Sequence, residues 1–151
     1  MNGYTQLLRH IKQTGQPLVS TITQGDIAAL DTNDTTLFPL LHVSVGNATF
    51  PADGVVRFSV KIGCFDIRDS TGEPNPDAYY DNDNEIDNLN ATLAILNRIW
   101  LLLKRDTDET NISVSGIPGL EQCTEFSQNL LDGWIMAFEV DTPNILINLC
   151  E

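Results

Sequence analysis

The segment from about residue 83 to residue 105 constrains the fold of this chain more than any other. Its apolar residues recur at alternating spacings of three and four, which is the period of one helix face; they are Ile86, Leu89, Leu93, Leu96, Trp100 and Leu103. Three further apolar residues widen this stripe, namely Ile95, Ile99 and Leu102. A stripe this broad is typical of a helix packed flat on a sheet, because a two-stranded coiled coil has a narrower seam.

Two segments alternate between apolar and polar residues and therefore predict strands. In residues 55–67 the apolar set is Val56, Phe58, Val60, Ile62 and Cys64, and in residues 134–140 it is Trp134, Met136, Phe138 and Val140. A period of two places one face of each strand on a core. Shorter strands are expected at residues 41–45, closed by a turn at residues 46–47, and at residues 112–114, followed by a turn at residues 116–119.

The order of these elements indicates the fold class. A short helix at residues 4–14 comes first, and the polar, Thr-rich residues 19–36 are expected to be irregular or to form an extended arm. Strands then cluster on either side of the long helix, which favours an α+β fold with a mainly antiparallel sheet packed against that helix. The length of 151 residues fits a single domain over residues 1–151, with residues 144–151 as a C-terminal tail.

The charge balance argues against two kinds of partner. The chain has 21 Asp and Glu against 8 Lys and Arg, a formal net charge of -13. Nucleic-acid binders gain affinity from basic residues that displace counterions, and anionic membranes attract basic residues too, so neither surface is expected here. With no secretory pattern and no apolar run long enough to span a bilayer, we expect a soluble protein made in a cytoplasm. Its three cysteines are expected to be reduced thiols, because their spacing suits neither a metal pair nor a disulfide framework.

An acidic run is the one cluster that suggests a ligand, and it consists of Asp77, Asp81, Asp83, Glu85 and Asp87. Asp81, Asp83 and Glu85 match the first, third and fifth positions of an EF-hand calcium loop. The match fails where the loop requires glycine, at Ile86, and where it requires a bidentate glutamate, at Thr92. An acidic helix N-terminus is the favoured interpretation, and a small calcium- or ligand-binding domain centred on residues 77–87 is an alternative.

Catalytic motifs are missing from the sequence. It contains no GxSxG, HExxH or phosphate-binding P-loop pattern, and its two histidines, His10 and His42, have no local catalytic signature. An enzyme would need a nucleophile–base pair built in space from one histidine and one cysteine. We therefore predict no enzyme, no catalytic residue and no cofactor.

The C-terminal third of the chain resembles small tail proteins of tailed bacteriophages. From Phe126 it combines an aromatic residue, a short turn, Gly133-Trp134, an alternating strand and Pro143-Asn144, and Cys150 lies next to the end. The layout of a short helix, a strand block, a long helix and a closing strand block fits as well. Together these features are similar to the tail terminator or tail-completion family, which joins the tail tube to the neck.

This resemblance implies a structural virion protein at the tail–neck junction. Members of the family form a ring, usually a hexamer, that caps the tail tube and docks to the neck or head connector. The implied partners are further copies of the chain, the tail tube protein and the neck proteins. Genomic DNA would pass through an acidic channel without specific binding, because carboxylates repel phosphates. Tail tube and stopper proteins are alternatives within the same tail.

Two sets of residues are assigned to this assembly. The interface candidates are Trp134, Phe126, Pro143, Asn144 and Cys150. The candidates for the lumen or a docking rim are the members of the acidic run, Asp77, Asp81, Asp83, Glu85 and Asp87, for which a solvated surface loop is an equal alternative. Exposed strand edges and the Thr-rich extended segment at residues 19–36 are expected to lie across a neighbouring copy.

Overall fold

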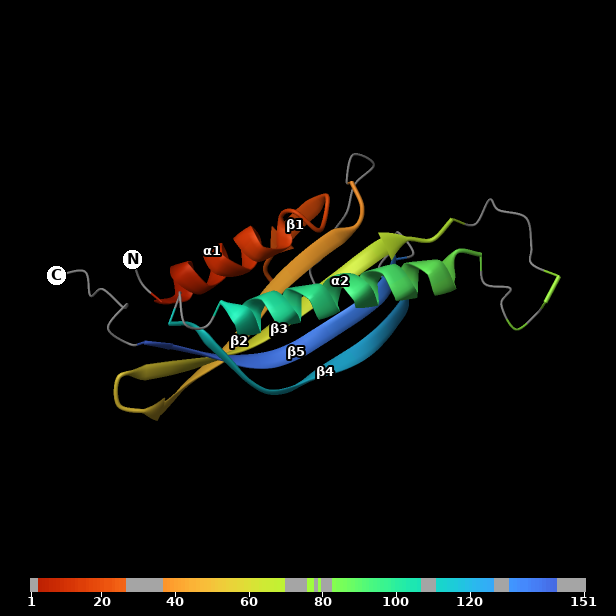
Figure 1. Ribbon diagram of the computed structural model, residues 1–151. Coiled ribbons are helices and arrows are strands. Elements are labelled where there is room, and N and C mark those ends of the chain that lie inside the picture. The colour runs from red at the N-terminus through yellow and green to blue at the C-terminus, as the bar shows by residue number, and fades with distance from the viewer. Residues whose placement is uncertain are drawn as a thin grey trace.

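One five-stranded sheet organises the chain. The computed structural model describes residues 3–26, 37–69, 76–77, 79, 83–106, 111–126 and 131–143. The elements are α1 (Gly3–Gly15), β1 (Thr21–Gln24), β2 (Leu40–Ala52), β3 (Val55–Ile67), α2 (Glu85–Arg105), β4 (Ser113–Phe126) and β5 (Leu131–Pro143). The strand order is β1-β2-β3-β5-β4 (Figure 1), with β1 parallel to β2 and the other three pairs antiparallel. The predicted α+β class with a mainly antiparallel sheet is confirmed.

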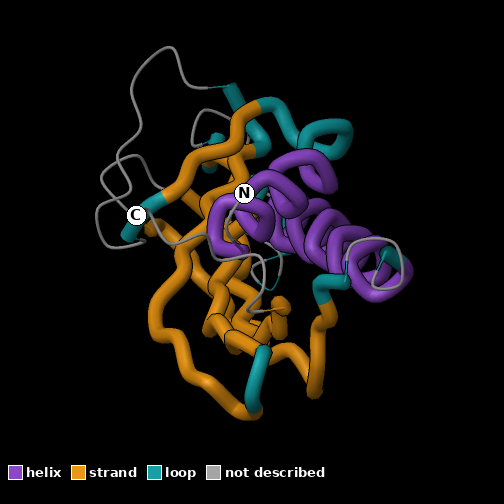
Figure 2. Tube along the Cα trace, turned by 90° about the vertical axis from the view of Figure 1, so that its left-hand side faces the viewer, coloured by secondary structure: helices purple, strands orange, loops and turns teal. Residues whose placement is uncertain are grey.

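Both helices cover the same face of this sheet (Figure 1 and Figure 2). The long helix α2 packs on β3, β4 and β5, and α1 packs beside it. The main core lies between the layers and takes alternate residues of β3, from Val56 to Cys64, together with Leu96, Ile99 and Leu103 of α2. Alternation thus buries one side of each strand, as the sequence predicts.

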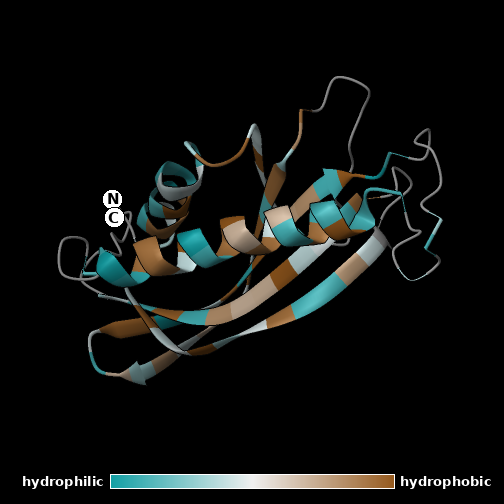
Figure 3. Ribbon diagram, turned by 45° about the vertical axis from the view of Figure 1, so that its right-hand side comes forward, coloured by the Kyte–Doolittle hydropathy of each residue, from teal (hydrophilic) through white to brown (hydrophobic). Residues whose placement is uncertain are grey.

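The apolar stripe of α2 is wider than the face that it buries. Bands of hydrophobic and hydrophilic residues follow one another along the helix (Figure 3). Leu93 and Ile86, both members of the predicted stripe, are 37% and 39% exposed. Part of the apolar surface of α2 is therefore left outside the core.

The long helix begins at Glu85, two residues later than the sequence suggests. Asp83 has a φ of 54°, which lies in the left-handed region, so it cannot belong to a right-handed helix. Asn84 precedes the first helical residue but makes no side-chain capping bond. Its amide is used instead in contacts with the end of β3, described below.

The predicted turn at residues 46–47 is wrong. β2 continues through Gly46 and Asn47 to Ala52, and its pairing with β3 shifts between Val45 and Ala48. The turn that joins β2 to β3 lies at Asp53-Gly54, where Gly54 has a φ of 77°. A glycine and an asparagine can enter a bulge as well as a turn, and here the sheet absorbs them as an irregularity.

The predicted turn at residues 116–119 is wrong for the same reason. β4 is a single strand, Ser113–Phe126, whose register against β5 shifts between Ser115 and Gly119. Gly116 has a φ of 79° in this irregular stretch. Part of the expected irregular segment is also a strand, because β1 pairs with β2 from Thr21 to Gln24. Residues 27–36 of that segment and the tail at residues 144–151 lie outside the described residues.

A second, smaller apolar cluster lies on the face of the sheet that has no helix among the described residues. It consists of Leu40, Phe65 and Leu131, all fully buried, with Phe38, Cys123 and Ile135 packed against it. Neither α1 nor α2 is long and apolar enough to cross a membrane, as far as the described residues extend.

Candidate assembly interface

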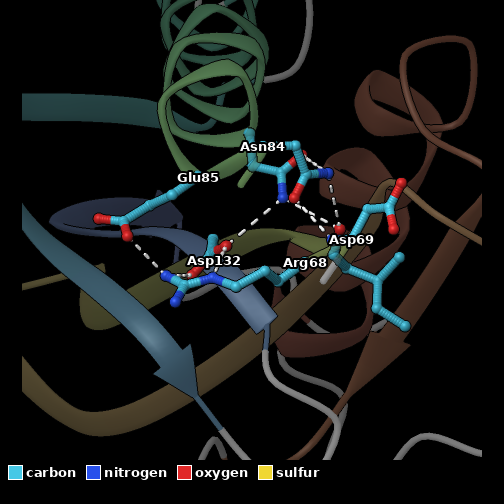
Figure 4. Close-up of polar contacts among 7 residues, drawn as sticks. Arg68, Asp69, Asn84, Glu85 and Asp132 are labelled. Carbon is cyan, nitrogen blue, oxygen red and sulfur yellow. Dashed lines mark hydrogen bonds and ion pairs between the residues drawn. The ribbon is translucent and has the colours of Figure 1, made fainter. Parts of the chain in front are cut away.

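The start of α2 is fixed to the sheet by a buried arginine. Arg68, just after β3, donates from Nε and Nη2 to the two carboxylate oxygens of Asp132 at 3.0 and 2.9 Å (Figure 4). Its Nη2 also donates to Glu85 of α2 at 2.7 Å. Asp132 is fully buried and the Arg68 side chain is 9% exposed. Arg68 thus joins β3, β5 and α2 through charge-assisted hydrogen bonds.

Two asparagines at the start of α2, Asn84 just before the helix and Asn88 within it, complete this connection. Asn84 donates to the carbonyl of Ile67 at 3.2 Å and accepts from the N–H of Asp69 at 2.6 Å (Figure 4). Asn88, which is buried, donates to the same carbonyl at 3.0 Å. These bonds connect the start of α2 to backbone groups at and just after the end of β3. The acidic end of α2 is therefore held on the sheet by hydrogen bonds.

The acidic run divides into exposed and engaged carboxylates. Asp77, Asp83 and Asp87 are exposed, so their charges face solvent. Glu85 is mostly buried and paired with Arg68, and for this reason it is not a free carboxylate at a rim. Asp81 lies outside the described residues. Within the described ranges, no group of three or more His, Cys, Asp or Glu side chains is placed to hold a metal ion.

The interface candidates do not form one patch. Trp134 is half-buried, packs against the main core, and donates its indole N–H to the carbonyl of Leu89 in α2 at 3.0 Å. Pro143 is the last residue of β5 and pairs with Val55. It is nine residues, and therefore about 30 Å along the strand, from Trp134. Phe126 ends β4 in register with Leu131. Asn144 and Cys150 lie outside the described residues.

The charges of the molecule are separated along α2. Five of the eight basic residues lie on α1 and on the second half of α2, and all five are exposed: Arg9, Lys12, Arg98, Lys104 and Arg105. The exposed carboxylates of the acidic run lie at or before the other end of α2. A helix of 21 residues is about 30 Å long, so an acidic end and a basic end face opposite ways.

The exposed end of β2 and the turn after it are the feature that the sequence analysis missed. We call residues 46–54 the arm, since all nine are exposed at the far end of β2 and its turn (Figure 1). Phe50 in the arm is 73% exposed, and residues 46–52 carry no charge. β1 covers the outer edge of β2 only from Leu40 to Val43, and no other described strand covers the rest. Asp53-Gly54 between two apolar runs was the available signal, because Asp-Gly favours a hairpin turn.

An apolar groove lies between α2 and β4, which is an outer strand of the sheet. Its volume is about 460 Å³. The apolar lining comes from Leu93, Ala94, Trp100, Pro118, Leu120 and Met136, and two asparagines, Asn90 and Asn97, complete it. Among the described residues that line the groove, none is charged. Ile117 beside it is 97% exposed, so the apolar surface extends onto the edge of β4.

His42 and Cys64, one of the histidine–cysteine pairs considered above, both lie in the sheet. His42 is buried; its Nε2 donates to the carbonyl of Gly25 at 3.1 Å and its Nδ1 accepts from Thr23 Oγ1 at 2.6 Å. Burial, together with the charge of Asp66, raises the pKa of Cys64 to about 12, so this thiol stays protonated. Because Leu41 is the register partner of Cys64, its neighbour His42 faces the opposite side of the sheet.

His10 is the other histidine, and it belongs to α1 and lies near the end of α2. It lines a surface pocket together with Arg98, Arg105 and Asp106. Its Nε2 is inaccessible to solvent and makes no hydrogen bond within the described structure. Burial lowers the pKa of His10, and the nearby charge of Asp106 opposes this shift. The imidazole is therefore held mainly in its neutral form.

Comparison with known proteins adds no identification. No protein-family model matches the sequence, and no curated protein matches it either.

Proposed function

We propose that this chain is a structural protein of a bacteriophage tail, a terminator that assembles into a ring and acts without catalysis. In this role it caps the tail tube at the tail–neck junction of the virion and joins it to the neck or head connector. It is made in the host cytoplasm and binds further copies of itself, most simply as a hexamer. The tail tube protein and the neck proteins are its other partners.

The observation that carries the proposal is the amount of exposed strand edge in this fold. The arm projects beyond the core, β4 presents a 14-residue outer edge, and an uncharged groove runs beside that edge. Unpaired strand edges favour pairing with other chains, and proteins that stay monomeric usually protect them. A rotational ring joins one surface of each copy to a different surface of the next, and these features supply two different surfaces.

The separation of charge along α2 supports a channel for DNA. If the acidic end of each copy faces the axis, the exposed Asp77, Asp83 and Asp87 line the lumen and repel phosphates. The five exposed basic residues of α1 and α2 then lie away from the DNA. The network around Arg68 holds the start of α2 on the sheet, and Asp83 and Asp87 lie at this fixed end.

The test is the mass of the protein in solution, measured by light scattering on a size-exclusion column, with negative-stain images of any large species. A ring with a central hole supports the proposal. A chain that stays monomeric at high concentration, and that forms no ring in the images, contradicts it.

The proposed lumen has its own test. Replacing Asp83 and Asp87 with lysine should leave the ring intact but allow it to retain DNA at low salt, with binding lost as salt rises. The control makes the same charge change on the helix-free face, at Glu121 and Glu139. Equal DNA retention by both variants would argue against a lumen at the acidic end.

A further inference from the structure

On the basis of the proposed ring, we infer that neighbouring copies are joined by the arm of one copy seated in the α2–β4 groove of the next. The contact places Phe50 of the arm against the groove, where Leu93, Trp100 and Leu120 are available. The occupant of the groove is therefore a second copy of this chain.

The arm is a site for a partner because it presents an apolar side chain and an open strand edge to water. Its strand pairs on one side only, with β3, which pairs in turn with β5 as far as Val55. All nine arm residues are exposed, and Phe50 leaves 73% of its surface in solvent. In the described structure, the outer edge of β2 also lacks a strand partner from Ser44 onward. An apolar surface beside an open edge is what strand-addition interfaces use.

The charge of the chain is compatible with another copy as the partner. Each chain carries a net charge of -13, so two copies repel wherever their acidic surfaces meet. The arm has no charge in residues 46–52, and no described lining residue of the groove is charged. Residues 46–52 can thus meet the groove without bringing like charges together or burying an unpaired one, and Asp53, the one charged residue of the arm, lies at its turn.

The groove has the size and position for this contact. Its volume of about 460 Å³ falls within the range of roughly 300–1,000 Å³ for pockets that enclose a small ligand, which leaves room for an aromatic side chain. The same copy cannot fill its own groove. Phe50 lies on β2, which is separated from β4 by β3 and β5. Along β3, the register partner of Thr49 is Arg57, which is five residues and about 16 Å from Ile62, the partner of Met136 in the groove.

Two single substitutions separate the two halves of the contact. Phe50→Asp puts a charge on the arm and leaves the groove intact, whereas Leu120→Asp does the reverse. Each should weaken self-association by about 30-fold or more, as expected for a central aromatic or aliphatic anchor. Phe50→Leu should keep assembly. Leu93→Asp is a second groove variant, in case Leu120→Asp perturbs β4.

The matched control is Leu101→Asp. Leu101 lies on α2, the helix that carries Leu93, is 50% exposed and does not line the groove. It should therefore leave self-association unchanged. Circular dichroism melts of all variants show whether each one is folded before its assembly is compared.

Mixing the two disabled variants is the decisive step. The arm of Leu120→Asp still fits the groove of Phe50→Asp, so the mixture should form dimers and nothing larger, while each variant alone stays monomeric. A mixture that stays monomeric would overturn the inference, since the two surfaces would then serve different contacts. Rings that persist in Phe50→Asp would also overturn it but would leave the proposed ring standing. A wild-type protein that is monomeric at every concentration would contradict both.

Discussion

Replacing Asp132 with asparagine should reveal how strongly the start of α2 depends on its buried arginine. The substitution keeps the shape of the side chain and removes its charge. Asp132 is fully buried, and the Arg68 side chain that it binds with both oxygens is only 9% exposed. In this variant Arg68 keeps its contact with the carboxylate of Glu85, at 2.7 Å.

The size of the effect follows from this burial. Removing one partner of a buried ion pair costs about 3–5 kcal/mol, because the other charge is left without compensation. Since Glu85 still balances part of the charge of Arg68, we expect the lower end, about 3 kcal/mol of unfolding free energy. For a chain of this length each kcal/mol corresponds to about 2–4 °C, so the melting temperature should fall by about 6–12 °C.

A second Arg–Asp pair in the same two strands provides the control. Arg57 of β3 and Asp141 of β5 are register partners that also form a bidentate contact, with Nε and Nη2 at 2.7 and 3.1 Å from the carboxylate oxygens. This pair is partly exposed, so water and salt screen it. Asp141→Asn should therefore lower the melting temperature much less than Asp132→Asn does.

The assay is thermal and urea unfolding followed by far-ultraviolet circular dichroism. Adding Arg68→Met and Glu85→Gln to Asp132→Asn removes the remaining two charges of the network, so the triple variant should be no less stable than Asp132→Asn alone. The reasoning is refuted if Asp132→Asn unfolds like wild type, or if it loses no more stability than Asp141→Asn.

Three further outcomes are expected. Trp134→Ala should lower the free energy of unfolding by about 3 kcal/mol in urea titrations, and Trp134→Phe by only about 1 kcal/mol, because phenylalanine keeps the packing and loses the bond to Leu89; equal losses would contradict the contact. Gly133→Ala should lower the melting temperature markedly, because its Cβ would overlap the backbone carbonyl of Cys64. Burial lowers the pKa of His10, so the neutral form favours the folded state and stability is lost as pH falls below the ordinary value. Wild type should thus lose more stability than His10→Gln between about pH 7.5 and 5.5, and parallel curves would contradict this.

Local patterns were enough to predict the central elements of the fold. The strand at residues 55–67 is predicted with the bounds that β3 has, because strict alternation over a long run fixes both its type and the face that it buries. The long helix is predicted to within two residues of α2, for the same reason of periodicity. The α+β class follows from the order of these elements.

Features that depend on pairing across the chain were not predictable in this way. Glycine at residues 46 and 116 indicated turns, but the neighbouring strands continue past both and absorb them as irregularities. The role of Asp132 was invisible too, since its partner Arg68 lies 64 residues away in the sequence. The arm and the groove were not predictable either. They depend on the extension of β2 to Ala52 and on the packing of α2 beside β4.

The central claim is that copies of this chain close into a ring, and native mass spectrometry over a concentration series tests it most directly. A closed ring gives one dominant assembly whose mass is a fixed multiple of the 16.7 kDa chain, with six copies as the simplest expectation. A single species at 16.7 kDa at every concentration contradicts the claim. An unlimited ladder of masses contradicts closure as well, because it indicates an open filament.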